Sequence, residues 1–297
     1  MTVGARLVAL LPTPTLLAYG AFGMPLAMAA LPLYVHLPKF YGDHLGVNLA
    51  LLGGVLLVLR LADGIIDPLL GVLSDRSGAR KRWLALAAPL LALGMVALFL
   101  PIPRAEVPLL VWLAIALALI YFAFSLATIN HQAWGAELST DPVERTRITA
   151  VREGLALLGV VIASILPSFL GGEDGGLGRF AVLFAAFTLV CAAITLLGTP
   201  GSPPVHVARA QSQSFRQLIG RPLADPLFRR LLVVFMLNGI AAAIPATLVL
   251  FFVADVLDAE GRQGLFLALY FIAGAAGMPL WVRACLLYTS PSPRDTR

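Results

Sequence analysis

About eight apolar runs of membrane-spanning length follow one another along this chain. A helix needs about 20 residues to cross the hydrocarbon core of a bilayer, where the backbone must satisfy its own hydrogen bonds. The runs cover residues 14–37, 46–70, 83–101, 108–134, 148–170, 179–199, 231–254 and 263–282. They predict an all-α polytopic membrane protein.

Composition agrees with this class. Hydrophobic residues make up 59% of the 297 residues and charged residues 12%, against about 25% charged residues in a soluble domain. The sequence shows no metal-ligand cluster, nucleophile elbow or phosphate loop. We therefore expect a monomeric membrane protein that is not an enzyme and has no cofactor. Its expected partners are the lipid bilayer and a small molecule, and not nucleic acid.

The net charge of +5 indicates membrane orientation, because the basic residues gather in alternate loops. They lie mainly in 71–82, 135–152 and 200–230, and the other loops hold only Lys39, Arg104, Arg179 and Arg262. Basic loops stay in the cytoplasm, so we expect a cytoplasmic amino terminus. The first run contains Ala27-Met28-Ala29, which suits signal-peptide cleavage, but the run is long, interrupted by prolines and followed directly by others.

The runs also predict the domain organisation. Six lie in an amino-terminal bundle, residues 1–199; a cytoplasmic linker, 200–230, contains Gly201-Ser-Pro-Pro204; and two lie in a partial carboxy-terminal bundle, 231–282. The tail, 283–297, fits neither a span nor an ordinary loop and resembles translated adapter sequence, so we set it apart from the fold. We expect a chain truncated at its carboxy terminus, with about four further spans missing, that transports nothing by itself.

The second run contains three ionisable residues, Arg60, Asp63 and Asp67. Their spacing of i, i+3 and i+7 places them on one face of a helix. A charge at the bilayer centre costs about 3 kcal/mol on insertion scales, so such residues usually face a cavity and have a function. Two acids so close cannot both ionise cheaply without a bound cation or a shared proton. The face is thus suited to holding a cation or a proton.

Other interpretations of these acids stay open. They could form an interhelical lock in which Arg60 neutralises one acid and the other caps a neighbouring helix. An intramembrane aspartyl protease needs its two acids on facing helices, which the spacing on one helix disfavours. Pro68 has no N–H to donate to the carbonyl of Gly64, which leaves that oxygen as a possible cation ligand.

Several motifs together resemble the glycoside–pentoside–hexuronide:cation symporters, the melibiose-permease-like branch of the major facilitator superfamily. The resemblance runs from about residue 15 to 282 and is carried by Tyr19-Gly20-Ala-Phe22-Gly23, Arg60…Asp63…Asp67-Pro68, Gly71-Val-Leu-Ser-Asp75-Arg76 and Ala133-Trp134-Gly135-Ala136-Glu137-Leu138…Asp141…Glu144-Arg145-Thr146-Arg147. It implies the major facilitator fold, with about eight of twelve membrane helices present. It also implies cation-coupled uptake of a small polar solute, expected to be a sugar or glycoside, across the plasma membrane (the bacterial inner membrane).

The resemblance implies that Asp63 and Asp67 are the acids of the cation site. The family has an amide between these acids, where this chain has Ile66, and a hydroxyl at the position of Ala127, one residue before Thr128. Sodium needs several hard oxygen ligands, whereas a proton needs only a suitable carboxylate, so proton coupling is favoured over sodium. The expected coupling residues are Arg60, Asp63, Gly64, Asp67 and Thr128, with a possible sodium ion at Asp63 and Asp67.

The expected solute site is less well defined, because the two acids that grip sugars in the family align with Pro25 and Asn130. The remaining polar and aromatic side chains expected to contact the solute are Tyr19, Asn130, His131, Trp134 and Arg152. An interhelical hydrogen bond is an equal alternative for His131. Arg152 could instead pair with an acid of another span.

The basic segment 75–82 resembles the cytoplasmic loop that holds helices of this superfamily together through charge pairs. The expected members of this cytoplasmic latch are Asp75, Arg76, Arg80, Arg82, Glu137, Asp141, Glu144 and Arg145. Plain orientation signalling is the alternative. Two other functions also stay open: lipid or lysolipid transport by the same fold, and a non-transporting membrane receptor or scaffold.

Overall fold

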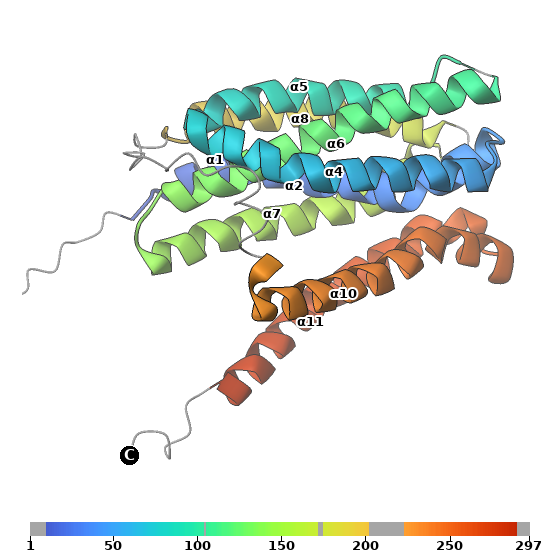
Figure 1. Ribbon diagram of the computed structural model, residues 1–297. Coiled ribbons are helices and arrows are strands. Elements are labelled where there is room, and N and C mark those ends of the chain that lie inside the picture. The colour runs from blue at the N-terminus through green and yellow to red at the C-terminus, as the bar shows by residue number, and fades with distance from the viewer. Residues whose placement is uncertain (1–9, 104, 172–174, 202–222, 290–297) are drawn as a thin grey trace, which may run out of the picture.

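The chain forms a bundle of long helices, which Figure 1 shows for the computed structural model. The structure describes residues 10–103, 105–171, 175–201 and 223–289, and no strand occurs among them. Its helices are α1 Thr13–Ala21, α2 Gly23–Leu31, η1 Pro32–His36, α3 Leu37–Lys39, η2 Phe40–His44, α4 Leu49–Ser77, α5 Arg80–Phe99, α6 Glu106–Glu137, α7 Pro142–Phe169, α8 Gly176–Gly198, α10 Pro226–Phe251, η3 Phe252–Val256, η4 Glu260–Arg262 and α11 Gln263–Thr289.

The expected all-α polytopic fold is confirmed. Seven helical segments of the described chain are long and apolar enough to cross a membrane, and an eighth apolar stretch, Gln263–Gly277, is shorter. These eight segments correspond in order to the eight predicted runs. The helices extend beyond several runs, because the polar residues that flank an apolar stretch continue the same helix.

The first span is longer than the predicted run 14–37, since it continues from Thr13 to His44. It contains two π-helical segments, η1 and η2. Pro32 begins η1 and Pro38 lies in α3, and neither proline has a backbone N–H to donate within the span. π-Helical turns of this kind are often found at functional sites.

Short polar and glycine signals set the ends of the next helices. The side chain of Asn48 accepts hydrogen bonds from the backbone N–H groups of Ala50 and Leu51 and so begins α4. Gly78, at φ 59°, ends α4 in the left-handed conformation that favours glycine. Asp141 caps α7 by accepting from the backbone N–H of Glu144. The turn at Gly78 brings Asp75 and Arg80 to the same end of the bundle.

Helices α5, α6 and α8 pack together, and α1 and α2 pack on α7. Glycine allows close contact on α7, where a Cβ atom at Gly159 would collide with the backbone of Met24. The largest buried side chains include Trp134, Tyr19, Tyr41 and Phe22. The core therefore lies within the first six spans.

The last two spans contact only part of this bundle. Helix α10 contacts η1 and α3, and α11 packs on α7. Leu250 and Val253, near the end of this span, are buried, whereas Phe235, earlier on α10, is 77% exposed. The first span and α10 therefore meet at the His44 end of the bundle, and Figure 1 shows α11 running away from the bundle toward its carboxy terminus.

The predicted linker and tail fall partly outside the described residues. Of the linker 200–230, residues 202–222 are not described, and α10 already begins at Pro226. Of the tail 283–297, residues 290–297 are not described, while residues 283–289 continue α11 to Thr289.

Candidate cation-coupling site

The acids predicted to bind a cation lie in the middle of a membrane-spanning helix. Asp63 is the central residue of the 29-residue helix α4. Arg60 Nη1 lies 3.3 Å from Asp63 Oδ2 and donates a hydrogen bond to it, as the i, i+3 spacing predicts. Ser125 Oγ on α6 donates a second hydrogen bond, of 3.2 Å, to Asp63 Oδ1. Both oxygens of this acid thus have partners, one on its own helix and one on α6.

The guanidinium of Arg60 lies against two aromatic rings. Its Cζ atom is 4.4 Å from the ring centre of Tyr34 on η1 and 4.6 Å from that of Tyr121 on α6. Cations within about 6 Å of a ring centre are attracted by the ring quadrupole. Arg60 therefore joins three spans at the level of Asp63.

Asp67 is in a different situation from Asp63. Its Oδ1 atom is buried and accepts no hydrogen bond from the described part of the chain, and the same holds for Thr128 Oγ1 on α6. Two side-chain hydrogen bonds join α4 to α6 in the described part of the chain: Ser125 to Asp63, and Ser74 to Asn130. Asp67 lies between Asp63 and Ser74 along α4, and Thr128 lies between Ser125 and Asn130 along α6.

Two oxygens that have no hydrogen-bond partner in the described part of the chain thus lie in one stretch of the seam between α4 and α6. Buried polar atoms nearly always have a hydrogen-bond partner or bind an ion or water. Arg60 already balances the charge of Asp63, which leaves Asp67 as the unbalanced acid. The arrangement is suited to a proton or a small cation that binds oxygen ligands. Among the described residues, no group of three His, Cys, Asp or Glu side chains could hold a metal ion.

Gly64, whose carbonyl was expected to be free, lies on an open part of the α4 surface, where a Cβ atom would meet nothing within 4 Å. Ile66 is 37% exposed and supplies no oxygen. The role of the Gly64 carbonyl stays a prediction.

Ser125 was missed by the sequence reasoning, which found Ala127 at the family's hydroxyl position and expected Thr128, the next residue, to contribute instead. The helical spacing contained the signal, since Ser125 precedes Thr128 by three residues and shares its face of α6. The packing of α6 against α4, which decides which hydroxyl reaches Asp63, cannot be read from one sequence.

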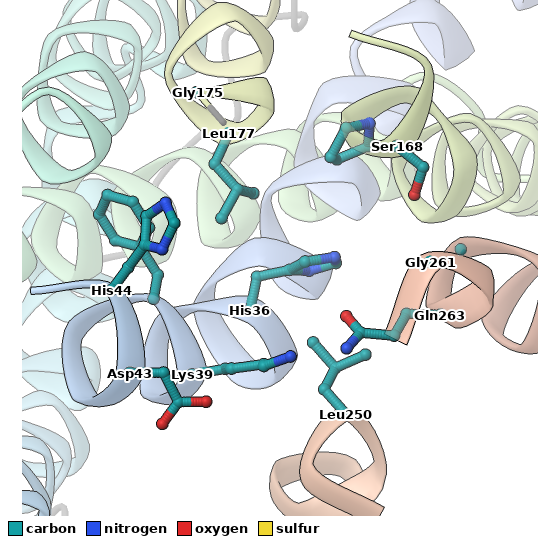
Figure 2. A pocket seen from close by; sticks show the side chains of 13 residues that line it. His36, Lys39, Asp43, His44, Ser168, Gly175, Leu177, Leu250, Gly261 and Gln263 are labelled. Carbon is teal, nitrogen blue, oxygen red and sulfur yellow. The ribbon is translucent and has the colours of Figure 1, made fainter. Parts of the chain in front are cut away.

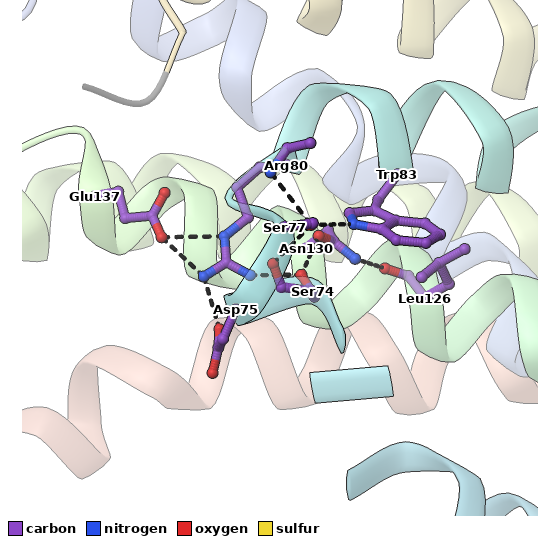
Figure 3. Close-up of polar contacts among 9 residues, drawn as sticks. Ser74, Asp75, Ser77, Arg80, Trp83, Leu126, Asn130 and Glu137 are labelled. Carbon is purple, nitrogen blue, oxygen red and sulfur yellow. Dashed lines mark hydrogen bonds and ion pairs between the residues drawn. The ribbon is translucent and has the colours of Figure 1, made fainter. Parts of the chain in front are cut away.

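Three residues of the expected cytoplasmic latch, Asp75, Arg80 and Glu137, contact one another, as Figure 3 shows. Their role as a latch stays a prediction. Arg80 is 7% exposed and donates hydrogen bonds to Glu137 Oε1, at 2.8 and 3.0 Å, and to Asp75 Oδ1, at 2.8 Å. It also donates to Ser74 Oγ, which donates to Asn130 Oδ1. The network ties α4, α5 and α6 together at the Gly78 end of the bundle.

The other expected latch residues lie apart from Arg80. Glu144 is 1% exposed and accepts a hydrogen bond of 3.0 Å from the backbone N–H of Leu11, so it holds the start of the first span to α7. Asp141 caps α7, and Arg145 donates to the carbonyl of Ser139 in its own loop. Arg76 and Arg82 are exposed and form no ion pair with another described residue.

Three residues expected to contact the solute are buried between helices in this structure. Tyr19, His131 and Trp134 are each no more than 1% exposed. Tyr19 donates to the carbonyl of His131 at 2.8 Å, and His131 Nε2 lies 2.9 Å from the carbonyl of Tyr19. Trp134 donates to the carbonyl of Pro200 at 3.1 Å. The interhelical bond considered for His131 is thus present, and solute contact by these three stays a prediction.

The remaining two expected solute contacts differ from each other. Asn130 is fully buried, and its Nδ2 donates to the carbonyl of Leu126. Arg152 is more accessible, with 16% of its side chain exposed, and it pairs with the neighbouring Glu153 rather than with an acid of another span. Of the five residues, Arg152 therefore has the side chain that is most accessible to a solute in this conformation.

A separate cavity of about 380 Å³, lined by both polar and apolar side chains, lies at the His44 end, where the first span meets the last two spans (Figure 2). The side chains of His36, Lys39 and Gln263 point into the space between them. His36 Nδ1 and Gln263 Nε2 are buried and have no hydrogen-bond partner within the described chain. None of the predicted cation or solute residues lines this cavity.

Known proteins with similar sequences identify the family of this chain. The family model described as MFS/sugar transport protein matches residues 16–288. An uncharacterized symporter of Synechocystis sp. is 30% identical, over 87% of this chain and 46% of its own length. The inner membrane symporter YicJ of Escherichia coli is 27% identical, over 47% of this chain and 32% of its own. The isoprimeverose transporter of Lactiplantibacillus pentosus is 25% identical, over 48% and 30% respectively.

The matched regions therefore span less than half the length of these relatives. The motifs, the helical membrane fold and the family match agree with one another over most of the chain. This protein is a multi-pass membrane protein that belongs to the MFS/sugar transport family, in its glycoside–pentoside–hexuronide:cation symporter branch.

Proposed function

We propose that the protein is a cation-coupled symporter of a small polar solute, a sugar or glycoside, working by alternating access. The observation that carries this proposal is the seam between α4 and α6. There Asp67 and Thr128 present buried oxygens that have no hydrogen-bond partner among the described residues, beside Asp63, whose charge Arg60 balances. A single cation on Asp67 would complete the charge balance, so we propose one cation for each transport cycle.

We propose the proton as this cation, with sodium as the alternative. Sodium requires several oxygen ligands at once, and both oxygens of Asp63 already have partners. A proton needs only the carboxylate of Asp67 and an acceptor within reach. Ser125 supplies a hydroxyl that the sequence did not predict. This additional oxygen is a possible sodium ligand, and for this reason sodium stays the alternative coupling ion.

The direction of opening follows from where the spans meet. The first span and α10 are in contact at the His44 end and separated at the Gly78 end. The basic loops lie at the Gly78 end, which by the positive-inside rule faces the cytoplasm. We therefore propose that this conformation is open toward the cytoplasm of a bacterial cell, in the inner membrane, and that the amino terminus is cytoplasmic.

Uptake by the purified full-length protein in proteoliposomes tests this function. Labelled isoprimeverose, other pentosides and disaccharides would be offered under an imposed pH gradient without sodium, and under a sodium gradient at constant pH. We expect accumulation of at least one solute that follows the pH gradient. Accumulation that follows only the sodium gradient would replace the proton by sodium, and no gradient dependence for any solute would contradict symport.

A further inference from the structure

Tyr34 and Tyr121 lie outside every motif used above, and both contact the guanidinium of Arg60. Tyr34 belongs to η1 of the first span and Tyr121 to α6. The two ring centres lie 4.4 and 4.6 Å from Arg60 Cζ, well within the range in which a ring attracts a cation. Tyr121 is 6% exposed and Tyr34 is 40% exposed, so one tyrosine of the pair is buried and the other is partly open at the surface.

The position of Arg60 decides what Asp63 can bind. Arg60 Nη1 is 3.3 Å from Asp63 Oδ2, so the guanidinium occupies the place that a cation would take on this oxygen. Arginine on a flexible stem has many rotamers, and holding it in one of them costs entropy. Rings on two other helices reduce that freedom and favour the rotamer that meets Asp63.

We propose that Tyr34 and Tyr121 are positioning residues of the cation site: their rings clamp Arg60 onto Asp63 from two other spans. The inference rests on the proposed cation coupling. The clamp keeps Asp63 occupied by an internal cation and leaves Asp67 as the acid that receives the coupling ion. Without the clamp, Arg60 competes less well with an external cation for the pair of acids.

Tyr34 also links the clamp to the contact between the first span and α10. It lies on η1, the π-helical segment against which α10 packs. A cation that shifts Arg60 changes the contact with Tyr34 and therefore acts on the segment where the first span meets α10. Linkage requires the reverse effect as well, so the arrangement of these spans changes cation affinity through the same contact.

The first test asks whether the clamp exists as an energetic interaction. A double-mutant cycle of Tyr34→Leu and Arg60→Gln would be measured by thermal unfolding of the purified full-length protein, and repeated with Tyr121→Leu. We expect the effects of each pair to be non-additive. Additive effects in both cycles would overturn the proposal. The control is Tyr270→Leu, since Tyr270 is 72% exposed on α11 and contacts Phe271.

The second test asks whether the clamp acts on cation binding. The unfolding temperature would be followed while sodium chloride replaces choline chloride at constant pH, and then across pH in choline chloride, because a bound ion stabilises the folded state. We expect both leucine variants to reach half of the stabilisation at an ion concentration lower by about threefold to tenfold. Tyr34→Phe and Tyr121→Phe keep the ring and should titrate like the unmodified protein.

The outcomes separate the two proposals. Leucine variants that titrate like the unmodified protein, together with a non-additive cycle, would show a purely structural contact and overturn the positioning role. Phenylalanine variants that shift as much as leucine variants would do the same, because the ring would not be the acting group. No response of the unmodified protein to either ion would contradict the proposed coupling instead, and the cycle would still decide whether the clamp exists.

Discussion

Ser125 Oγ on α6 donates a hydrogen bond of 3.2 Å to Asp63 Oδ1 on α4. The acid at the centre of one span is thereby fixed to the neighbouring span and not only to Arg60 on its own helix. Two α4–α6 hydrogen bonds, this one and Ser74 to Asn130, lie on either side of Asp67, whose Oδ1 accepts no hydrogen bond from any described residue. The geometry of the proposed cation site therefore depends on how these two helices pack.

We predict that Ser125→Ala changes cation coupling, because the carboxylate of Asp63 loses a donor that stabilises its charged form. A buried hydrogen bond to a charged group contributes about 1.5–3 kcal/mol, so a proton should bind the pair of acids more tightly, and the proton concentration for half-maximal uptake should fall by about tenfold or more. Uptake rates measured against pH check this. Ser125→Thr keeps the hydroxyl and should keep the pH dependence of the unmodified protein.

The matched control for this change is Ser164→Ala. Ser164 is also fully buried, but its hydroxyl donates to the carbonyl of Val161 on its own helix, α7. The same loss of a hydroxyl there should leave the cation dependence unchanged. Equal effects of the two alanine variants would mean that Ser125 acts on general packing and not on Asp63.

Arg80 and its two acids should differ in importance. Arg80→Gln leaves Glu137, which is 19% exposed, without its cation, and breaking a buried pair costs about 3–5 kcal/mol. Asp75→Asn removes a partner that is 71% exposed, and exposed pairs are worth about 0–1 kcal/mol. Thermal unfolding should therefore show a clearly lower midpoint for Arg80→Gln and a nearly unchanged one for Asp75→Asn. The reverse order would contradict the burial-based ranking.

Tyr19 and Arg152 separate structural from solute-binding roles. Tyr19→Phe removes the hydrogen bond to the His131 carbonyl and should cost about 1 kcal/mol of stability, with the solute concentration for half-maximal uptake unchanged. Arg152→Gln should raise that concentration with little change in stability, because its partner Glu153 is 57% exposed. Uptake kinetics and thermal unfolding of both variants distinguish the structural role from the solute-binding role. A raised half-saturation value for Tyr19→Phe would show that this buried residue is exposed to solute during the cycle.

The orientation in the membrane can be tested with two exposed valines at opposite ends of the bundle. Val143 is 74% exposed at the start of α7, and Val107 is 71% exposed at the start of α6. In a Cys191→Ala and Cys285→Ser background, a membrane-impermeant maleimide should label Val107→Cys in intact cells. It should label Val143→Cys only after the membrane is opened. Labelling in the opposite order would invert the proposed topology.

The sequence was sufficient to predict the class of fold, because apolar length and loop charge depend on local composition. It also predicted the pair of Arg60 and Asp63, since i, i+3 neighbours on a helix are close whatever surrounds them. Ser125, Tyr34 and Tyr121 could not be found in this way. They reach the site from other spans, and which residue of α6 or η1 faces α4 depends on tertiary packing.

The same limit explains the expected solute site and the extended latch. Tyr19, His131 and Trp134 form a plausible polar and aromatic set in sequence, yet the packing of the first span on α6 buries them. The latch residues share a region of sequence but divide into two groups, because Arg80 faces Glu137 whereas Glu144 faces Leu11. Charge pattern alone could not separate these groups.

The most direct measurement compares gradient-driven accumulation with equilibrium exchange of the solute in proteoliposomes containing Asp63→Asn or Asp67→Asn. The amide of Asp67→Asn mimics a protonated acid that cannot release its proton, and Asp63→Asn leaves Arg60 without its acid, so that Arg60 can balance Asp67 in place of the coupling ion. For both variants we predict that accumulation is lost while exchange without a gradient persists. Asp255→Asn, an exposed acid on η3, should behave like the unmodified protein. Accumulation that is unchanged when both Asp63 and Asp67 are replaced would contradict the assignment of the cation site.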